Sequence, residues 1–223
     1  MIRPGSMDPG IPAALGLVLF LGLVAGIVRY GVGWLARLRV GRGPAAAPRR
    51  TPSFLLDQGL VEAASEELRR AHRAKRPVAI LLCNLDNFRN INAVHGHAVG
   101  DAVIRAFGEV LAEVGDAGDV LGRLRADEFI FLRHPATARD AKRLAVRIQE
   151  RLRSMPSLDE KRLECSIGIA ITSPVATDWE SVLQAADLAL LAAKRGGGNR
   201  AVVSTEPPRA RPAGADGPYP RVA

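Results

Sequence analysis

Between residues 61 and 203 the sequence alternates short apolar runs with longer amphipathic segments. The run VAILLCNL at 78–85 is apolar almost throughout, which is typical of a strand buried on both faces. The expected order is helix–β–α–α–β–β–α–β–α–β, over residues 61–76, 78–85, a short helix ending near 96, 99–114, 120–124, 129–132, 136–154, 162–172, 179–195 and 199–203. Because two consecutive strands form a hairpin, we predict an α/β sandwich whose mixed sheet is of the ferredoxin-like, split βαβ type and is flanked by helices.

A second apolar region lies near the amino terminus. Residues 11–28 carry no charge, and the residues from Tyr30 to position 36 are again largely apolar. A helix needs about 20 apolar residues to cross a bilayer, and Tyr30 and Trp34 stand where interfacial aromatic residues are expected. A cleaved signal peptide and a buried core helix are the alternatives, but a signal peptide has a shorter apolar core and a small-residue cleavage site. We therefore predict one transmembrane helix at 11–36.

An arginine cluster follows this apolar segment and predicts its orientation. Its members are Arg29, Arg37, Arg39, Arg42, Arg49 and Arg50. Because positively charged flanks stay on the cytoplasmic side, residues 1–10 are expected outside and the rest of the chain inside, which predicts a single-pass protein of the inner membrane. The chain then divides into a basic linker at 37–55, a cytoplasmic domain at 56–204 and a disordered Pro-rich tail at 205–223. The arginines are expected to face anionic lipids of the inner leaflet.

The formal net charge of +8 does not favour nucleic acid as a partner. Much of the excess lies beside the predicted membrane helix and in the tail, and aromatic residues make up only 4% of the chain, which leaves few platforms for stacking bases. The two cysteines, Cys83 and Cys165, each fall in an apolar run and are expected to be buried, reduced thiols.

Four motifs of the predicted domain resemble those of the GGDEF domain, the catalytic module of diguanylate cyclases. They are NLDNFRNINAVHGHAVGD (84–101), RADEF (125–129), CSIGIA (165–170) and AADLALLAAKRGGGN (185–199), and they agree with the family in order and spacing over roughly 56–203. The resemblance implies two domains that face each other as a dimer, each holding one GTP. Cyclic di-GMP forms as each 3′-hydroxyl attacks the partner's α-phosphate and pyrophosphate leaves, with Mg²⁺ steadying the phosphates.

The resemblance assigns roles to five retained residues. Asn92 and Asp101 match the pair that recognises guanine, and Lys194 matches a lysine that contacts phosphate. Asp127 and Glu128 match the acidic pair, one expected to bind metal and one, Glu128, to assist catalysis if the domain is active. On the residues alone, Asn92 could instead cap a helix and Asp101 could lie at a helix start, Lys194 could be a solvated side chain at a helix end, and the acidic pair could be a polar turn.

The departures from the family pattern concern the phosphate and metal positions. Asn84 stands where the family has its first metal-binding Asp, and a neutral amide is a poorer magnesium ligand than a carboxylate. Asp86, two residues on, faces the same side of a strand and could partly substitute. Arg125 and Ala126 replace both signature glycines; if the turn requires positive φ, each costs roughly 1–2 kcal/mol, and their side chains would enter the space of the triphosphate. Gly198 replaces an arginine of the last motif.

Two further departures lie upstream of the signature. The family often carries an R-x-x-D product-inhibition site, and this chain has Asp116 and Asp119 at those positions. An aspartate in place of the arginine would repel an anionic dinucleotide, so sensing of cyclic di-GMP through that site is disfavoured. The amino-terminal element of the family has no clear match in LLDQGLVEAASEELRR.

These observations predict a membrane-anchored, degenerate GGDEF protein of bacterial cyclic di-GMP signalling that acts without catalysis, as a guanine-nucleotide-binding or protein-interaction module. A weak magnesium site would be formed by Asp127, Asp86 and Asn84, or would be absent. A low-activity diguanylate cyclase that uses Asp86, Asp127 and Glu128 is the first alternative. A scaffold that binds no nucleotide is the second. Expected partners are GTP, anionic lipids and a second signalling protein in a homodimer or heterodimer.

Overall fold

The computed structural model describes residues 54–172 and 179–205, all of which belong to one unit that spans Gly43–Ala223. The predicted transmembrane helix and most of the predicted linker and tail lie outside the described residues. Within the described ranges, no helix is both long enough and apolar enough to cross a membrane.

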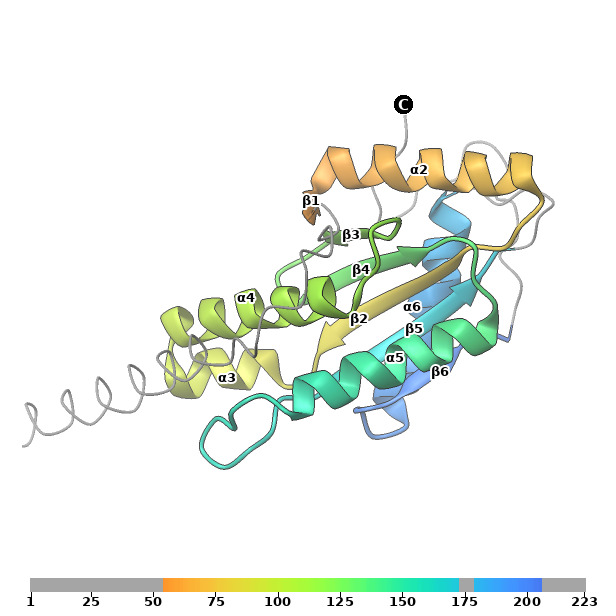
Figure 1. Ribbon diagram of the computed structural model, residues 1–223. Coiled ribbons are helices and arrows are strands. Elements are labelled where there is room, and N and C mark those ends of the chain that lie inside the picture. The colour runs from red at the N-terminus through yellow and green to blue at the C-terminus, as the bar shows by residue number, and fades with distance from the viewer. Residues whose placement is uncertain (1–53, 173–178, 206–223) are drawn as a thin grey trace, which may run out of the picture. The chain divides into compact units, whose positions relative to one another are not determined.

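A six-stranded mixed sheet forms the centre of the described part, in the order β1-β3-β4-β2-β5-β6 (Figure 1). The central strand β2 pairs antiparallel with β4 on one side and with β5 on the other, whereas β1 runs parallel to β3 and β6 runs parallel to β5. The strands are β1 Phe54–Leu56, β2 Ala79–Leu85, β3 Val120–Arg123, β4 Glu128–Arg133, β5 Cys165–Ile171 and β6 Ala201–Val203. This mixed sheet confirms the predicted α/β class and its internal hairpin, β3–β4.

Helices cover both faces of this sheet, as Figure 1 shows for α5 and α6. They are α2 Asp57–Ala74, α3 Phe88–His95, α4 His97–Val114, α5 Ala138–Arg153 and α6 Trp179–Arg195. Ile80 and Leu82 of β2 belong to an apolar cluster with residues of α2 and α6. Because side chains alternate along a strand, the intervening Leu81 and Cys83 face the layer formed by α4 and α5. Both layers are buried, and burial raises the pKa of the Cys83 thiol.

The structure adds an edge strand that the sequence did not predict. β1 begins at Phe54, inside the segment expected to be linker and before the expected start of the domain at residue 56. β1 pairs with β3 and is followed directly by α2, which begins at Asp57 rather than at residue 61. The linker prediction was therefore wrong for the residues just before 56, because β1 is formed by pairing with a distant strand and has little local signal.

Close packing of α6 on the sheet depends on Gly168 of β5. A Cβ atom at this position would lie 2.0 Å from the Ala186 carbonyl oxygen and 2.4 Å from the Leu190 nitrogen, both in the α6 backbone. No side chain fits there, so glycine allows helix and strand backbones to approach each other. This contact places the carboxyl end of α6, which carries Lys194, at a fixed height above the sheet.

Candidate functional site

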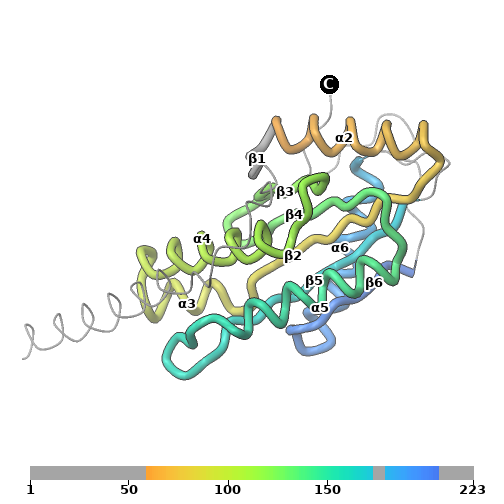
Figure 2. The backbone as a smooth tube through the Cα atoms, in the orientation of Figure 1, coloured from red at the N-terminus to blue at the C-terminus, as the bar shows by residue number. Residues whose placement is uncertain are grey.

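A pocket of about 780 Å³ lies where β2 ends, within the range typical of small-molecule sites. Figure 2 shows α3 and α4 beside this end of β2. The pocket is lined by the end of β2 and the start of α3, by the tip of the β3–β4 hairpin, and by the loop after α6. The lining residues are Asn84, Leu85, Asp86, Asn87, Phe88, Arg89, Asn90, Ala93, Asp127, Glu164, Lys194, Gly197 and Gly198.

Asp86 fastens the loop after α6 to the end of β2. Its Oδ1 accepts a hydrogen bond from the Ser166 hydroxyl at 2.7 Å, and its Oδ2 accepts one from the Asn199 backbone N–H at 2.8 Å. The Asn199 side chain in turn donates to Glu164 Oε1 at 2.9 Å, and the Asp86 N–H donates to the Glu164 carbonyl. Both oxygens of Asp86 are thus engaged within the protein, which is a structural role for this carboxylate.

The loop held by Asp86 contains two glycines with positive φ, Gly197 at 108° and Gly198 at 74°. Their N–H groups donate to the Lys194 and Ala193 carbonyls and so satisfy the last turn of α6. A Cβ atom at Gly198 would lie 3.3 Å from Asp86 Oδ2. The arginine that the family pattern has here would therefore be strained in this loop.

The hairpin tip takes a turn that does not require glycine. Arg125 and Ala126 are absent from the described residues that have positive φ, so the strain considered for these substitutions does not arise. Instead, the Arg123 guanidinium donates to the carbonyls of Arg125 at 3.1 Å and Ala126 at 2.5 Å. The Leu85 N–H donates to the Asp127 carbonyl at 3.2 Å, which ties the tip to the end of β2.

Glu128 lies directly opposite Asn84 in the β2–β4 ladder, so the two side chains share one face of the sheet. The Glu128 side chain is 13% exposed, and Arg125 Nη1 lies 3.4 Å from its Oε2. Burial raises the pKa of Glu128, while the nearby charges of Arg125 and Lys194 act in the opposite direction. The position to which the motif assigns catalysis thus holds a largely buried carboxyl group, which forms an ion pair with an arginine that stands in place of glycine.

The predicted metal ligands do not form a convincing magnesium site. Asn84, Asp86 and Asp127 all line the pocket, but Asn84 offers an amide and Asp86 is engaged as described above. In the described part of the chain, no group of three or more His, Cys, Asp and Glu side chains is arranged to hold a metal ion. One uncommitted carboxylate beside an amide fits magnesium poorly, and the assignment stays a prediction.

Asn92 lies in α3 and Asp101 in α4, and neither is the N-cap of its helix. Asn92 lies within α3, whose N-cap is Asn87, and Asp101 lies within α4, whose N-cap is Gly96. A Cβ at Gly100 would come within 1.8 Å of Asn92 Oδ1, so glycine makes room for this amide against α4, one residue before Asp101. Helix capping, the alternative role for Asn92, is therefore wrong, and Asp101 is the fifth residue of α4 rather than its first. Neither residue lines the pocket itself.

Sequence reasoning gave no role to Arg89, which lines the pocket from the first turn of α3. Its side chain is exposed and, with Lys194, gives the pocket two cations. The signal was present in the motif, since Arg89 stands at the Lys of the family pattern D-x-D-x-F-K. A phosphate-bearing ligand would meet these cations from two sides of the pocket.

Asp116 and Asp119, at the positions of the product-inhibition motif, form an ion cluster with Arg133 of the same chain. Arg133, at the end of β4, donates through Nε to Asp119 Oδ1 at 2.9 Å and through Nη2 to Asp119 Oδ2 at 2.5 Å. The same Nη2 lies 2.9 Å from Asp116 Oδ2. We call Asp116, Asp119 and Arg133 the Arg133 clasp; it holds the end of the β3–β4 pair that lies away from the hairpin tip.

Comparison with known proteins agrees with this fold. The sequence model of the family described as "Diguanylate cyclase, GGDEF domain" matches residues 58–200. The chain is 33% identical over 140 residues to the probable diguanylate cyclase DgcC of Escherichia coli strain K12, which covers 62% of this chain and 38% of that protein. It therefore spans less than half of that relative.

Two solved structures have the same fold. The active GGEEF domain of a diguanylate cyclase from Vibrio cholerae superposes with a TM-score of 0.65 at 24% identity, over 69% of this chain and 99% of that one. The GGDEF domain of PA1120 (YfiN or TpbB) from Pseudomonas aeruginosa gives 0.62 at 27% identity, over 69% and 98%.

Proposed function

From the premise that the chain belongs to the GGDEF family of diguanylate-cyclase domains, we propose that it binds a guanine nucleotide without converting it to cyclic di-GMP. It then serves cyclic di-GMP signalling as a nucleotide-dependent interaction module, in a homodimer or with another signalling protein. The observation that carries this proposal is the cross-strand pair of Asn84 and Glu128, with Arg125 ion-paired to Glu128.

Phosphoryl transfer by this family depends on charge stabilisation at that pair. An amide at position 84 removes one anionic metal ligand. Arg125 forms an ion pair with Glu128, with Nη1 3.4 Å from Oε2. A bound metal stabilises a transferring phosphoryl group by several kcal/mol, and each 1.36 kcal/mol changes the rate about tenfold. The combined loss is large enough to remove useful turnover.

Binding is less affected than catalysis, because the residues that would hold the nucleotide are present. Asn92 and Asp101 offer an amide and a carboxylate that can pair with the Watson–Crick edge of guanine. Arg89 and Lys194 supply two cations for the phosphates. Without a tightly held metal to neutralise the triphosphate, we expect weak GTP binding that depends little on Mg²⁺.

The test uses a fragment of residues 54–205, which contains the whole apolar core cluster. The isolated GGDEF domain of PA1120 was solved as a separate chain, so a domain of this kind folds without its flanking segments. Calorimetry should show GTP bound in preference to ATP, and Asp101→Ala should weaken GTP while leaving ATP unchanged. Equal affinity for the two nucleotides would favour a scaffold without a nucleotide site.

A low-activity cyclase is the second candidate, favoured by the retained Asp127 and Glu128 at the hairpin. Incubation of the fragment with GTP and either Mg²⁺ or Mn²⁺, followed by chromatography of the products, separates the two. Cyclic di-GMP produced in amounts that rise with Mn²⁺ would overturn the non-catalytic proposal.

The proposal also includes attachment to the inner membrane by a helix at 11–36, with residues 1–10 outside and the GGDEF domain in the cytoplasm. It rests on the uncharged run and on the arginines that follow it. Fusions of a reporter at Pro48 should be active only with a cytoplasmic reporter. A periplasmic signal, or release of a shortened soluble protein, would contradict this topology.

A further inference from the structure

Helix α5 presents an exposed basic stripe that the nucleotide site does not use. Arg139, Lys142, Arg143, Val146 and Arg147 recur at the spacing of one helix face and line an open groove on the surface. Val146, in the middle of the stripe, is 48% exposed. We call these five residues the α5 face. The opposite side of the helix is buried against the sheet, so the face points to solvent.

The cations of the α5 face are largely uncompensated. Helix α5 has six basic and two acidic residues, a net charge of +4. Arg143 pairs with Asp140 at 2.6 Å, but Arg139, Lys142 and Arg147 form no ion pair with a described residue. Their side chains therefore keep their full charge available to an external anion.

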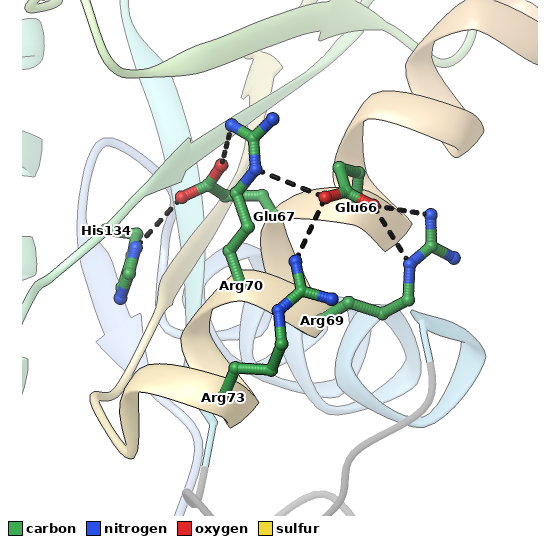
Figure 3. A network of polar contacts seen from close by, with 6 residues as sticks. All are labelled: Glu66, Glu67, Arg69, Arg70, Arg73 and His134. Atoms are coloured by element: carbon green, nitrogen blue, oxygen red, sulfur yellow. Dashed lines mark hydrogen bonds and ion pairs between the residues drawn. The ribbon is translucent and has the colours of Figure 1, made fainter.

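Helix α2, in the other helix layer, provides the contrast. Its three arginines, Arg69, Arg70 and Arg73, all lie within 3.2 Å of Glu66, and Glu67 contacts Arg70 and His134 (Figure 3). With four carboxylates in the helix its net charge is −1. Both helices thus carry several basic side chains. The arginines of α2 are paired with carboxylates of the same helix, whereas most of the cations of the α5 face are not.

We propose that the α5 face docks on an anionic lipid bilayer. An extended surface of phosphate headgroups complements a row of separate cations, and an exposed valine among them can enter the headgroup region. The face carries no aromatic side chain for stacking bases, which argues against single-stranded nucleic acid. The proposal does not require the membrane helix predicted at 11–36, since the α5 face itself supplies the contact.

This docking would leave the nucleotide pocket open. The α5 face begins just after β4 ends, and in the β2–β4 ladder Arg133 pairs with Ala79 at the start of β2. The pocket lies at the other end of β2. A bilayer against the first turns of α5 therefore meets the end of the domain away from the pocket, so nucleotide and lipid do not compete.

The experiment measures co-sedimentation of the 54–205 fragment with vesicles at low salt. The probes are vesicles of phosphatidylcholine alone and of phosphatidylcholine with one quarter phosphatidylglycerol. The triple variant Arg139→Gln, Lys142→Gln, Arg147→Gln should bind the anionic vesicles roughly 100-fold more weakly, at about fivefold per cation. Vesicles without phosphatidylglycerol should not bind, and added salt should release the wild-type fragment.

A matched control removes the same charge from α2, as Arg69→Gln, Arg70→Gln, Arg73→Gln. This variant should bind anionic vesicles within about threefold of wild type, because those arginines are already paired with Glu66. Equal loss of vesicle binding in both variants would show that only the net charge matters, and this would contradict docking through the α5 face. The proposal would also be contradicted if the wild-type fragment did not bind the anionic vesicles, or if it bound duplex DNA instead.

Nucleotide binding and membrane docking through the α5 face can be tested independently of each other. The α5 variant should keep wild-type GTP affinity in calorimetry and a wild-type urea midpoint, so loss of vesicle binding would not arise from unfolding. A fragment that binds vesicles but no GTP would contradict the proposed function and leave the α5 face intact.

Discussion

Replacement of Asp86 by alanine tests whether this carboxylate stabilises the fold through its hydrogen bonds or serves as a metal ligand. The change removes the acceptor of the Ser166 hydroxyl, which is fully buried, and of the Asn199 N–H. A hydrogen bond to a charged group contributes about 1.5–3 kcal/mol, and a buried donor left without an acceptor costs about 1–3 kcal/mol. Because the site is only partly buried, we expect a combined loss of about 2–4 kcal/mol in the free energy of unfolding.

The assay is urea and thermal unfolding of the 54–205 fragment, with and without Mg²⁺. For a domain of this size, about 2–4 °C per kcal/mol predicts a fall in Tm of roughly 5–15 °C. The control is Asp127→Ala, because the Asp127 side chain makes no hydrogen bond with a described residue; it should change stability by about 0.5 kcal/mol or less. An unchanged midpoint for Asp86→Ala, or a wild-type stabilisation by Mg²⁺ that this variant loses, would refute the structural assignment and favour the metal role.

Three further predictions concern packing, pH and catalysis. Gly168→Ala should destabilise the fragment by about 3 kcal/mol in urea unfolding, because the new methyl meets the α6 backbone; Gly59→Ala, with nothing within 4 Å, should instead be neutral or stabilising. Hydrogen bonds from Thr137 and the charge of Arg143 hold the pKa of Asp140 well below its usual range, so its stabilisation is present above the ordinary carboxyl pKa and is lost as the pH falls through the depressed value. Asp140→Asn should thus lower the urea midpoint at neutral pH, and its difference from wild type should vanish in acid; a constant difference would exclude this cause. The triple change Asn84→Asp, Arg125→Gly, Ala126→Gly should restore more cyclic di-GMP synthesis, measured by chromatography, than Asn84→Asp and the paired glycine change added together; a folded but silent triple variant would place the defect elsewhere.

Much of the fold could be predicted because its main elements carry strong periodic signals. Helix α6 was expected at 179–195 and spans Trp179–Arg195, and β2 was expected at 78–85 and spans Ala79–Leu85. β1 could not be predicted, because a strand as short as Phe54–Leu56 owes its existence to pairing with β3.

Four of the predicted site residues line the pocket, but Asn92, Asp101 and Glu128 do not, and the interactions within the site were not predicted. Asn84, Asp86, Asp127 and Lys194 do line one pocket, as their motifs suggested. The engagement of Asp86 depends on partners 80 and 113 residues away, which no local pattern reveals.

The shape of the hairpin tip was also hidden from the sequence. It depends on whether Arg123 reaches two turn carbonyls, and that is a property of the folded hairpin. The strain expected for Arg125 and Ala126 was therefore conditional on a turn that this chain does not adopt.

The Arg133 clasp has a consequence for how such a domain would behave in a signalling circuit. Feedback needs a surface where the end product can settle, and here both oxygens of Asp119 are already taken by Arg133, with Asp116 beside them. We therefore expect cyclic di-GMP to bind poorly at that position. If the domain binds guanine nucleotide as proposed, we expect its response to follow the supply of GTP and not the amount of cyclic di-GMP already made.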